Sequence, residues 1–137
     1  MTEAQQTYPP AVRRWHEIAA SRDAAGLDDL LADDIVFVSP VVHTPQRGKP
    51  IAKAYLIAAV ATLGNDSFRF VGYWGAESSA VLEFVTVIDG VEVNGVDIIG
   101  WNADDRIVSF RVMVRPLKGI EVLRAKMAER LETMRRV

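Results

Sequence analysis

The chain has 137 residues, of which half are apolar and a quarter charged, and its net charge is -2. This length and composition predict one soluble domain over residues 1–137, large enough to bury a core. Lysine and arginine are scattered, which argues against a nucleic-acid surface, and the lack of cysteine excludes disulfides, thiolate chemistry and cysteine–zinc sites.

The sequence predicts neither a signal peptide at residues 1–6 nor a membrane-spanning segment. Residues 1–6 are polar and lack the apolar region of a signal peptide. The longest apolar run, residues 55–63, is too short to span a bilayer. We therefore expect a cytoplasmic protein.

The first half of the chain predicts three helices and one short strand. Proline is tolerated in the first turn of a helix, so Pro9-Pro10 marks the start of the first one. Asp33-Asp34 predicts a turn before the strand, and Gly64 closes the last helix. The expected elements are helices at 9–20 and 24–32, a strand at 35–38 and a helix at 50–63.

After residue 66 the hydrophobic period changes from 3.6 to 2, which predicts strands. Asp89-Gly90 is a strong signal for a type I′ hairpin turn. The expected elements are strands at 67–77, 79–89, 91–102 and 106–115, and a charged helix at 117–137 whose end frays at Arg135-Arg136. Helices around a short strand, followed by a four-strand antiparallel meander, predict an α+β cone with an apolar interior.

The hairpin register places one carboxylate among apolar side chains. A two-residue turn pairs Ile88 with Val91, and counting outward sets Leu82 opposite Asp97. Alternation then gives one inward row in the two central strands and a second in the last strand. These rows are Ala80, Leu82, Phe84, Asp97, Ile99 and Trp101, and Val108, Phe110, Val112 and Val114. A bulge at Gly95 or Gly100 would shift this register.

Asp97 has two interpretations. It is a structural carboxylate, at the rim or bonded to a backbone amide, or it is a pocket acid whose raised pKa lets it donate a hydrogen bond or move a proton. We take Asp97 as the main candidate catalytic residue.

The segment from Leu31 to Gly48 resembles the nuclear transport factor 2-like superfamily, and in particular the ketosteroid isomerases and SnoaL-like polyketide cyclases. The resembling pattern is Leu31-Ala32-Asp33-Asp34, a short strand, and Ser39-Pro40-Val41 through Pro45-Gln46-Arg47-Gly48 opening a helix. The similarity extends from about Val12 to Val114. It implies a cystatin-like cone with a deep apolar pocket, usually a homodimer, and leaves the function open because this scaffold hosts many chemistries.

The resemblance carries over only part of the isomerase machinery. Ser39 occupies the place of the aspartate base, and Trp15 that of the oxyanion-hole tyrosine. The supporting tyrosine falls on Leu56, next to Tyr55, while the protonated oxyanion-hole aspartate matches Asp97. Serine cannot abstract a proton next to a carbonyl unaided, and an indole N–H is a poorer donor than a phenol. We therefore do not expect a ketosteroid isomerase.

Other candidate chemistry is sparse. His43 follows the first strand and is a weak candidate for the missing base, although a solvated loop histidine is the plainer interpretation. An Asp–Arg–Asp site of the epoxide-hydrolase type would need an inward arginine, whereas the register sends Arg111 outward. No spacing predicts a metal site, and no motif predicts a cofactor.

The aromatic interior suits a flat hydrophobic ligand as well as a simple core. The expected pocket residues are Trp15, Phe37, Ser39, Tyr55, Leu82, Phe84, Ile99, Trp101, Phe110 and Val112.

Three functions fit these features: an isomerase- or cyclase-like enzyme acting on an apolar ring or carbonyl compound, a non-catalytic binder of such a molecule, and an accessory dimerisation domain. Under all three we expect a homodimer through the outer sheet face, where Val81, Ile98 and Met113 lie among charged side chains. The expected partner is a small hydrophobic molecule, and we expect no nucleic acid or membrane.

Overall fold

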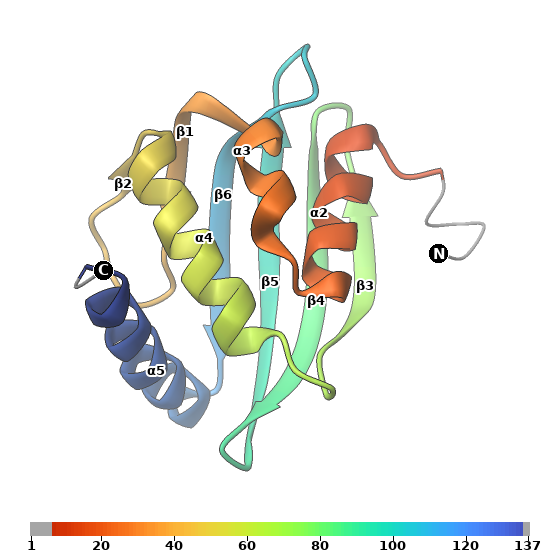
Figure 1. Ribbon diagram of the computed structural model, residues 1–137. Coiled ribbons are helices and arrows are strands. Elements are labelled where there is room, and N and C mark those ends of the chain that lie inside the picture. Colours follow the sequence, from red (N-terminus) through yellow and green to blue (C-terminus); the bar gives the residue numbers. More distant parts are fainter. Residues whose placement is uncertain (1–6, 136–137) are drawn as a thin grey trace.

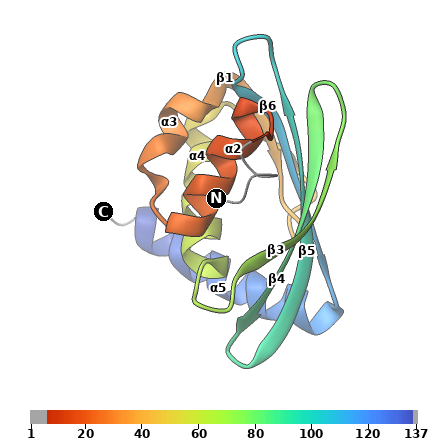
Figure 2. The same cartoon turned by 90° about the vertical axis from the view of Figure 1, so that its right-hand side faces the viewer.

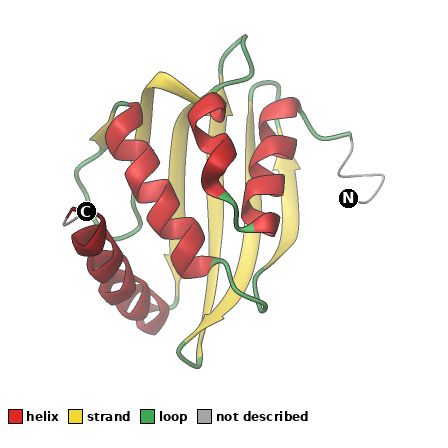
Figure 3. Cartoon of the chain, viewed as in Figure 1, coloured by secondary structure: helices red, strands yellow, loops and turns green. Residues whose placement is uncertain are grey.

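The computed structural model describes residues 7–135; residues 1–6 and 136–137, where the signal-peptide and part of the fraying predictions fall, lie outside it. Helices and strands are separated into two layers (Figures 1 and 3). The elements are α2 (Pro10–Ser21), η1 (Ala24–Gly26), α3 (Leu27–Leu30), β1 (Leu31–Val38), β2 (Gln46–Arg47), α4 (Lys49–Leu63), β3 (Arg69–Gly75), β4 (Ser79–Ile88), β5 (Val91–Trp101), β6 (Ile107–Arg115) and α5 (Leu117–Arg135).

One curved sheet carries α2, α3 and α4 on a single side, and α5 runs along the lower end of the same side (Figure 2). The strand order is β2-β1-β6-β5-β4-β3, so the predicted four-strand meander, β3 to β6, forms most of the sheet. β1 extends it by pairing parallel to β6, and the two-residue β2 pairs antiparallel with β1. Within residues 7–135, no helix combines the length and apolarity needed to cross a membrane.

The β4–β5 hairpin agrees with the predicted register. Asp89 and Gly90 both have positive φ, 51° and 78°, as a type I′ turn requires. The turn pairs Ile88 with Val91, and six residues away from the turn on each strand Leu82 pairs with Asp97. The inward position of Asp97 therefore follows from a local turn signal.

The predicted helix over 24–32 was too long. The helical segment ends at Leu30, and β1 already begins at Leu31. Leu31 is fully buried and pairs with Ile107 of β6, so this backbone belongs to the sheet rather than to a helix. Asp33 and Asp34 lie within β1, exposed, at a register irregularity rather than in a turn between two elements.

The predicted inward row of the last strand was wrong at its first residue. Ile107 is fully buried, whereas Val108 is half-buried. Gly100 pairs with Ser109 but Trp101 pairs with Ile107, so a bulge beside Gly100 adds one residue to β6 and reverses the alternation there. Beyond the bulge the prediction holds: Phe110 and Val112 are buried and Arg111 is exposed.

Candidate functional site

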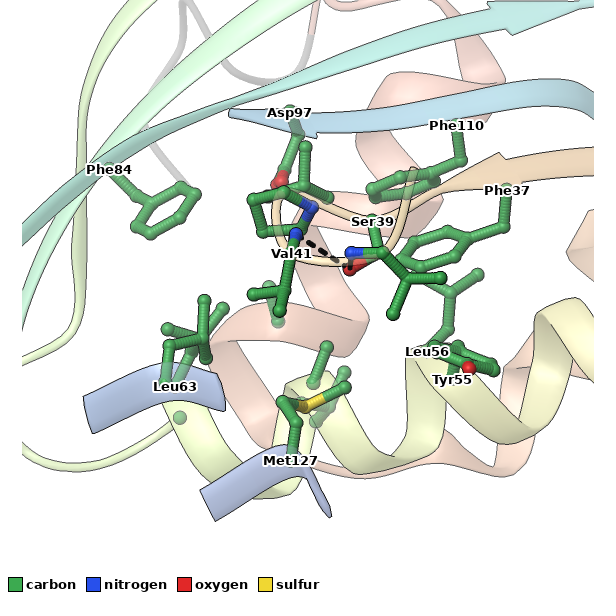
Figure 4. A pocket seen from close by; sticks show the side chains of 18 of the residues that line it. Phe37, Ser39, Val41, Tyr55, Leu56, Leu63, Phe84, Asp97, Phe110 and Met127 are labelled. Carbon is green, nitrogen blue, oxygen red and sulfur yellow. Dashed lines mark hydrogen bonds between the residues drawn. The ribbon is translucent and has the colours of Figure 1, made fainter. Parts of the chain in front are cut away.

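A cavity of about 270 Å³ lies between the inner face of the sheet and helices α2, α4 and α5. Figure 4 shows Asp97 pointing into it from the strand side, with Leu63 and Met127 opposite. Its lining is nearly all apolar or aromatic, apart from the polar side chains Ser39, Tyr55, Asp97 and Arg124. The arrangement is therefore an apolar cavity with very few polar groups, which is typical of a small-molecule site.

The sheet register holds Asp97 in this chamber. Asp97 pairs with Leu82 of β4 on one side and with Val112 of β6 on the other, so its side chain is fixed at the middle of the inner face. Only 4% of Asp97 is exposed. A central strand position with neighbours on both sides leaves the side chain one direction, into the cavity.

Trp15 of α2, which is far from Asp97 in the sequence, holds the carboxyl group by a hydrogen bond. Its indole Nε1–H donates a hydrogen bond of 3.1 Å to Asp97 Oδ2. The indole ring itself is fixed by an edge-on contact with Phe110, whose ring centroid lies 4.8 Å away. Among residues 7–135 no other hydrogen bond reaches Asp97, so Oδ1 is left for a ligand.

Burial raises the pKa of Asp97 from 3.8 to about 7, and the Trp15 hydrogen bond opposes this rise only in part. A low-polarity environment disfavours the charged carboxylate, while the indole N–H stabilises it. Near neutral pH both forms are populated. The neutral form can donate a hydrogen bond through its O–H, and the charged form can accept a proton.

Ser39 adds a hydroxyl group to the wall of the cavity. Its Oγ accepts hydrogen bonds from the backbone N–H groups of Val41 and Val42, at 3.0 and 3.2 Å, and so shapes the loop after β1. These two bonds use Oγ as an acceptor and leave its proton to donate. Two amide donors polarise the hydroxyl group and make it a better donor to a ligand.

Aromatic rings form one side of the chamber. Phe37 lies 5.6 Å from Tyr55 and 5.9 Å from Phe110, measured between ring centroids. Phe68 stacks on Phe84 at 5.5 Å on another part of the wall. Flat apolar surfaces of this kind accept ring systems without demanding hydrogen bonds.

Most of the predicted pocket residues line the cavity, and four predicted site residues do not. Trp15, Phe37, Ser39, Tyr55, Phe84, Asp97, Phe110 and Val112 line it. Leu82, Ile99 and Trp101 are buried in the core outside the lining. The candidate base His43 is exposed and is also absent from the lining.

The contribution of α5 to the cavity was not among the features predicted from the sequence. Leu123, Met127 and Leu131 line the cavity from this helix, together with Arg124. Their spacing of four residues was a readable signal for an inward helix face, but we expected only a charged helix that frays at Arg135-Arg136. Within residues 7–135 no three histidine, aspartate or glutamate side chains gather as metal ligands.

Comparisons with known proteins agree with this architecture. The SnoaL-like domain family matches residues 12–110. A structure described as a steroid delta-isomerase from Pseudomonas aeruginosa is 32% identical, with a TM-score of 0.87, over 100% of this chain and 98% of that one.

A Silicibacter pomeroyi DSS-3 protein with a cystatin-like fold is 28% identical, with a TM-score of 0.88, over 97% and 93% of the two chains. A Catenulispora acidiphila protein with a ketosteroid isomerase-like fold, solved with trimethylamine, is 17% identical over 89% and 95%, with a TM-score of 0.63, and supports the fold alone. No curated protein matches significantly. The predicted superfamily and cystatin-like fold are confirmed.

Proposed function

Because the chain belongs to the SnoaL-like domain family, we propose that it binds an apolar ring or carbonyl compound in its cavity and transfers a proton through Asp97. The observation that carries this proposal is a buried carboxyl group, with a pKa near neutrality, that faces an apolar chamber. A raised pKa in a cavity is typical of a functional acid or base.

The apolar lining selects the body of the ligand. A charged or strongly polar molecule would lose its hydration there without finding partners, whereas a ring system gains from burial against Phe37, Phe84 and Phe110. A carbonyl oxygen can accept a hydrogen bond from the protonated Asp97 carboxyl group or from the Ser39 hydroxyl group of the wall.

The chemistry that this set of groups supports is proton relocation within one molecule. The Asp97 carboxylate removes a proton from a carbon next to the carbonyl group, and the C–H electron pair moves into an enolate. The resulting carboxylic acid then returns the proton to another carbon of the same enolate, so the double bond shifts and nothing else is consumed. Ser39 donates a hydrogen bond to the enolate oxygen during this step.

A β,γ-unsaturated ketone with an apolar body is the substrate that tests this proposal, because its conjugated product is followed by ultraviolet absorbance. We expect turnover by the native chain and a loss of at least about 100-fold in kcat for Asp97→Asn. Asp34→Asn removes an exposed carboxylate from β1 and serves as the control, with activity unchanged. Affinity for the saturated ketone, measured by calorimetry, is expected to change little in Asp97→Asn.

The second candidate is a non-catalytic binder, which is favoured because no residue of 7–135 brings a histidine or a second carboxylate to the cavity lining. Saturable binding of the ketone without turnover, unaffected by Asp97→Asn, would support the binder. If the native chain neither binds nor converts such ketones, the proposal fails in both forms.

A further inference from the structure

Within the described part of the chain, Arg124 is the one cationic side chain that lines the cavity, and nothing in the proposed chemistry uses it. It lies on α5, one residue after the buried Leu123, and it is exposed to solvent. Because Arg124 both lines the cavity and reaches solvent, it marks a place where the chamber opens to the outside.

The charge of Arg124 is not neutralised within the part of the chain that the structure describes. Two other cations of α5 have carboxylate partners: Lys126 pairs with Asp89 at 3.2 Å and Arg135 with Glu132 at 3.8 Å. No ion pair or hydrogen bond joins Arg124 to any residue of 7–135. Burial and the Trp15 hydrogen bond account for the pKa of Asp97, so Arg124 does not compensate that carboxyl group either.

The cavity is therefore electrically asymmetric. Its sheet side ends in an acid that gains a negative charge on ionisation, and this end repels an anion. Its α5 side ends in an exposed guanidinium group, which is suited to a carboxylate and loses little hydration at the surface. These two ends favour one orientation for a ligand with an anionic group, with that group outward.

We propose that the natural ligand is a carboxylate-bearing apolar carbonyl compound, whose carboxylate pairs with Arg124 while its apolar carbonyl end lies against Asp97. This inference rests on the proposed function and adds the charge and the orientation of the ligand. The wall near Asp97 selects the carbonyl end, and Arg124 distinguishes an acid from its neutral ester.

The matched probes are 4-benzoylbenzoate and its methyl ester, which share an apolar aromatic ketone and differ in the charge. Their affinities are measured by displacement of the neutral fluorophore N-phenyl-1-naphthylamine. The measurement is made at pH 6, where the carboxylate of 4-benzoylbenzoate is ionised. We expect Arg124→Gln to weaken the carboxylate about five-fold, the range of an exposed ion pair, and to leave the ester within about two-fold. Arg124→Lys keeps the charge and should retain most of the affinity.

Arg130→Gln is the control, because it removes the same charge from the same helix at a position outside the cavity lining. It should leave both affinities unchanged. Raised salt should reduce the preference for the carboxylate in the native chain and have no such effect in Arg124→Gln.

The outcomes separate this inference from the proposed function. The role of Arg124 would be overturned if Arg124→Gln and Arg130→Gln lost carboxylate affinity equally, or if neither lost any. Binding of the ester would in that case still support the apolar site. Failure of both probes to displace the fluorophore would instead remove the site on which the inference rests.

Discussion

At the scale of single residues, Asp97 is a carboxyl group whose burial in charged form costs free energy, and the fold tolerates this cost. Apolar residues occupy the neighbouring inward positions, and the hydrogen bond from Trp15 offsets only part of the cost of a charge there. A purely structural carboxylate would ordinarily be held by several donors or by a cation, which lower its pKa. Among the described residues Asp97 has one neutral donor, and its pKa is raised; this combination favours a functional role over a structural one.

The raised pKa makes the stability of the native chain depend on pH. Between pH 3.8 and about 7 the unfolded chain has lost the Asp97 proton while the folded chain keeps it. The folded state binds more protons there, so the free energy of unfolding falls as the pH rises and levels off above about 7. Asn at position 97 has no charge to bury, and Asp97→Asn should escape this loss.

We therefore expect Asp97→Asn and the native chain to have similar stability near pH 4, and the variant to be more stable at pH 8 by up to about 4 kcal/mol. Urea unfolding at the two pH values measures the difference. A gap that is the same at both pH values would contradict the raised pKa of Asp97.

At the scale of elements, the packing between β4, β5 and β6 depends on a glycine, Gly95, because this position has no room for a side chain. A Cβ built on Gly95 would lie 2.5 Å from Phe84 Cζ and 2.7 Å from the backbone oxygen of Met113. The backbone oxygen belongs to the paired strand β6 and cannot move away without breaking the ladder. Gly95 thus lets the Phe84 ring cross over β5 to form the wall of the cavity.

Gly95→Ala should destabilise the chain by about 1–3 kcal/mol, the usual range for an overpacked core. Gly100→Ala, in the same strand, meets its nearest side-chain atom at 3.7 Å and should cost clearly less. The midpoint of thermal or urea unfolding compares the two variants. Equal losses would show that the backbone freedom of glycine, rather than the contact with Phe84, sets the effect.

The parts of this fold that were predictable depend on local signals. The Asp89-Gly90 turn fixed the β4–β5 register, and period-2 alternation then gave the inward position of Asp97 and its aromatic neighbours. The parallel pairing of β1 with β6 joins segments more than 70 residues apart in the sequence, so no local sequence pattern predicts it. The same holds for the bond from Trp15 to Asp97, and for α5, whose inward face is defined only by the cavity it closes.

At the scale of the whole molecule, the sheet has one covered face and one bare face. All the helices in Figure 2 lie on the same side. On the other side, one row crosses four strands, since each of its residues is paired with the next: Trp74, Val81, Ile98 and Arg111. The last three of these residues each lie between two buried neighbours along the strand. Trp74 is 58% exposed and Met113 51% exposed. Such an apolar sheet surface is unusual for a protein that remains a monomer.

A second copy of the chain is the occupant that this face suits best. Glu83 and Arg111 both lie on it, so two copies facing one another about a two-fold axis can bring an acid of one to a base of the other while the apolar side chains meet between them. We expect a homodimer with twice the chain mass of 15.2 kDa. Met113→Glu would bury a carboxylate in each half of that interface and should yield monomers that still fold.

Light scattering coupled to size exclusion measures the mass, and circular dichroism checks the fold of each variant. Leu117→Glu is the matched control, because Leu117 is 71% exposed but belongs to α5 rather than to the sheet. It should remain dimeric. A monomeric native chain, or a dimer that Leu117→Glu disrupts and Met113→Glu does not, would mean that the bare face is not where two copies meet. Because the cavity opens on the opposite side of the sheet, dimerisation through this face leaves Arg124 free, and ligand affinity should not depend on protein concentration.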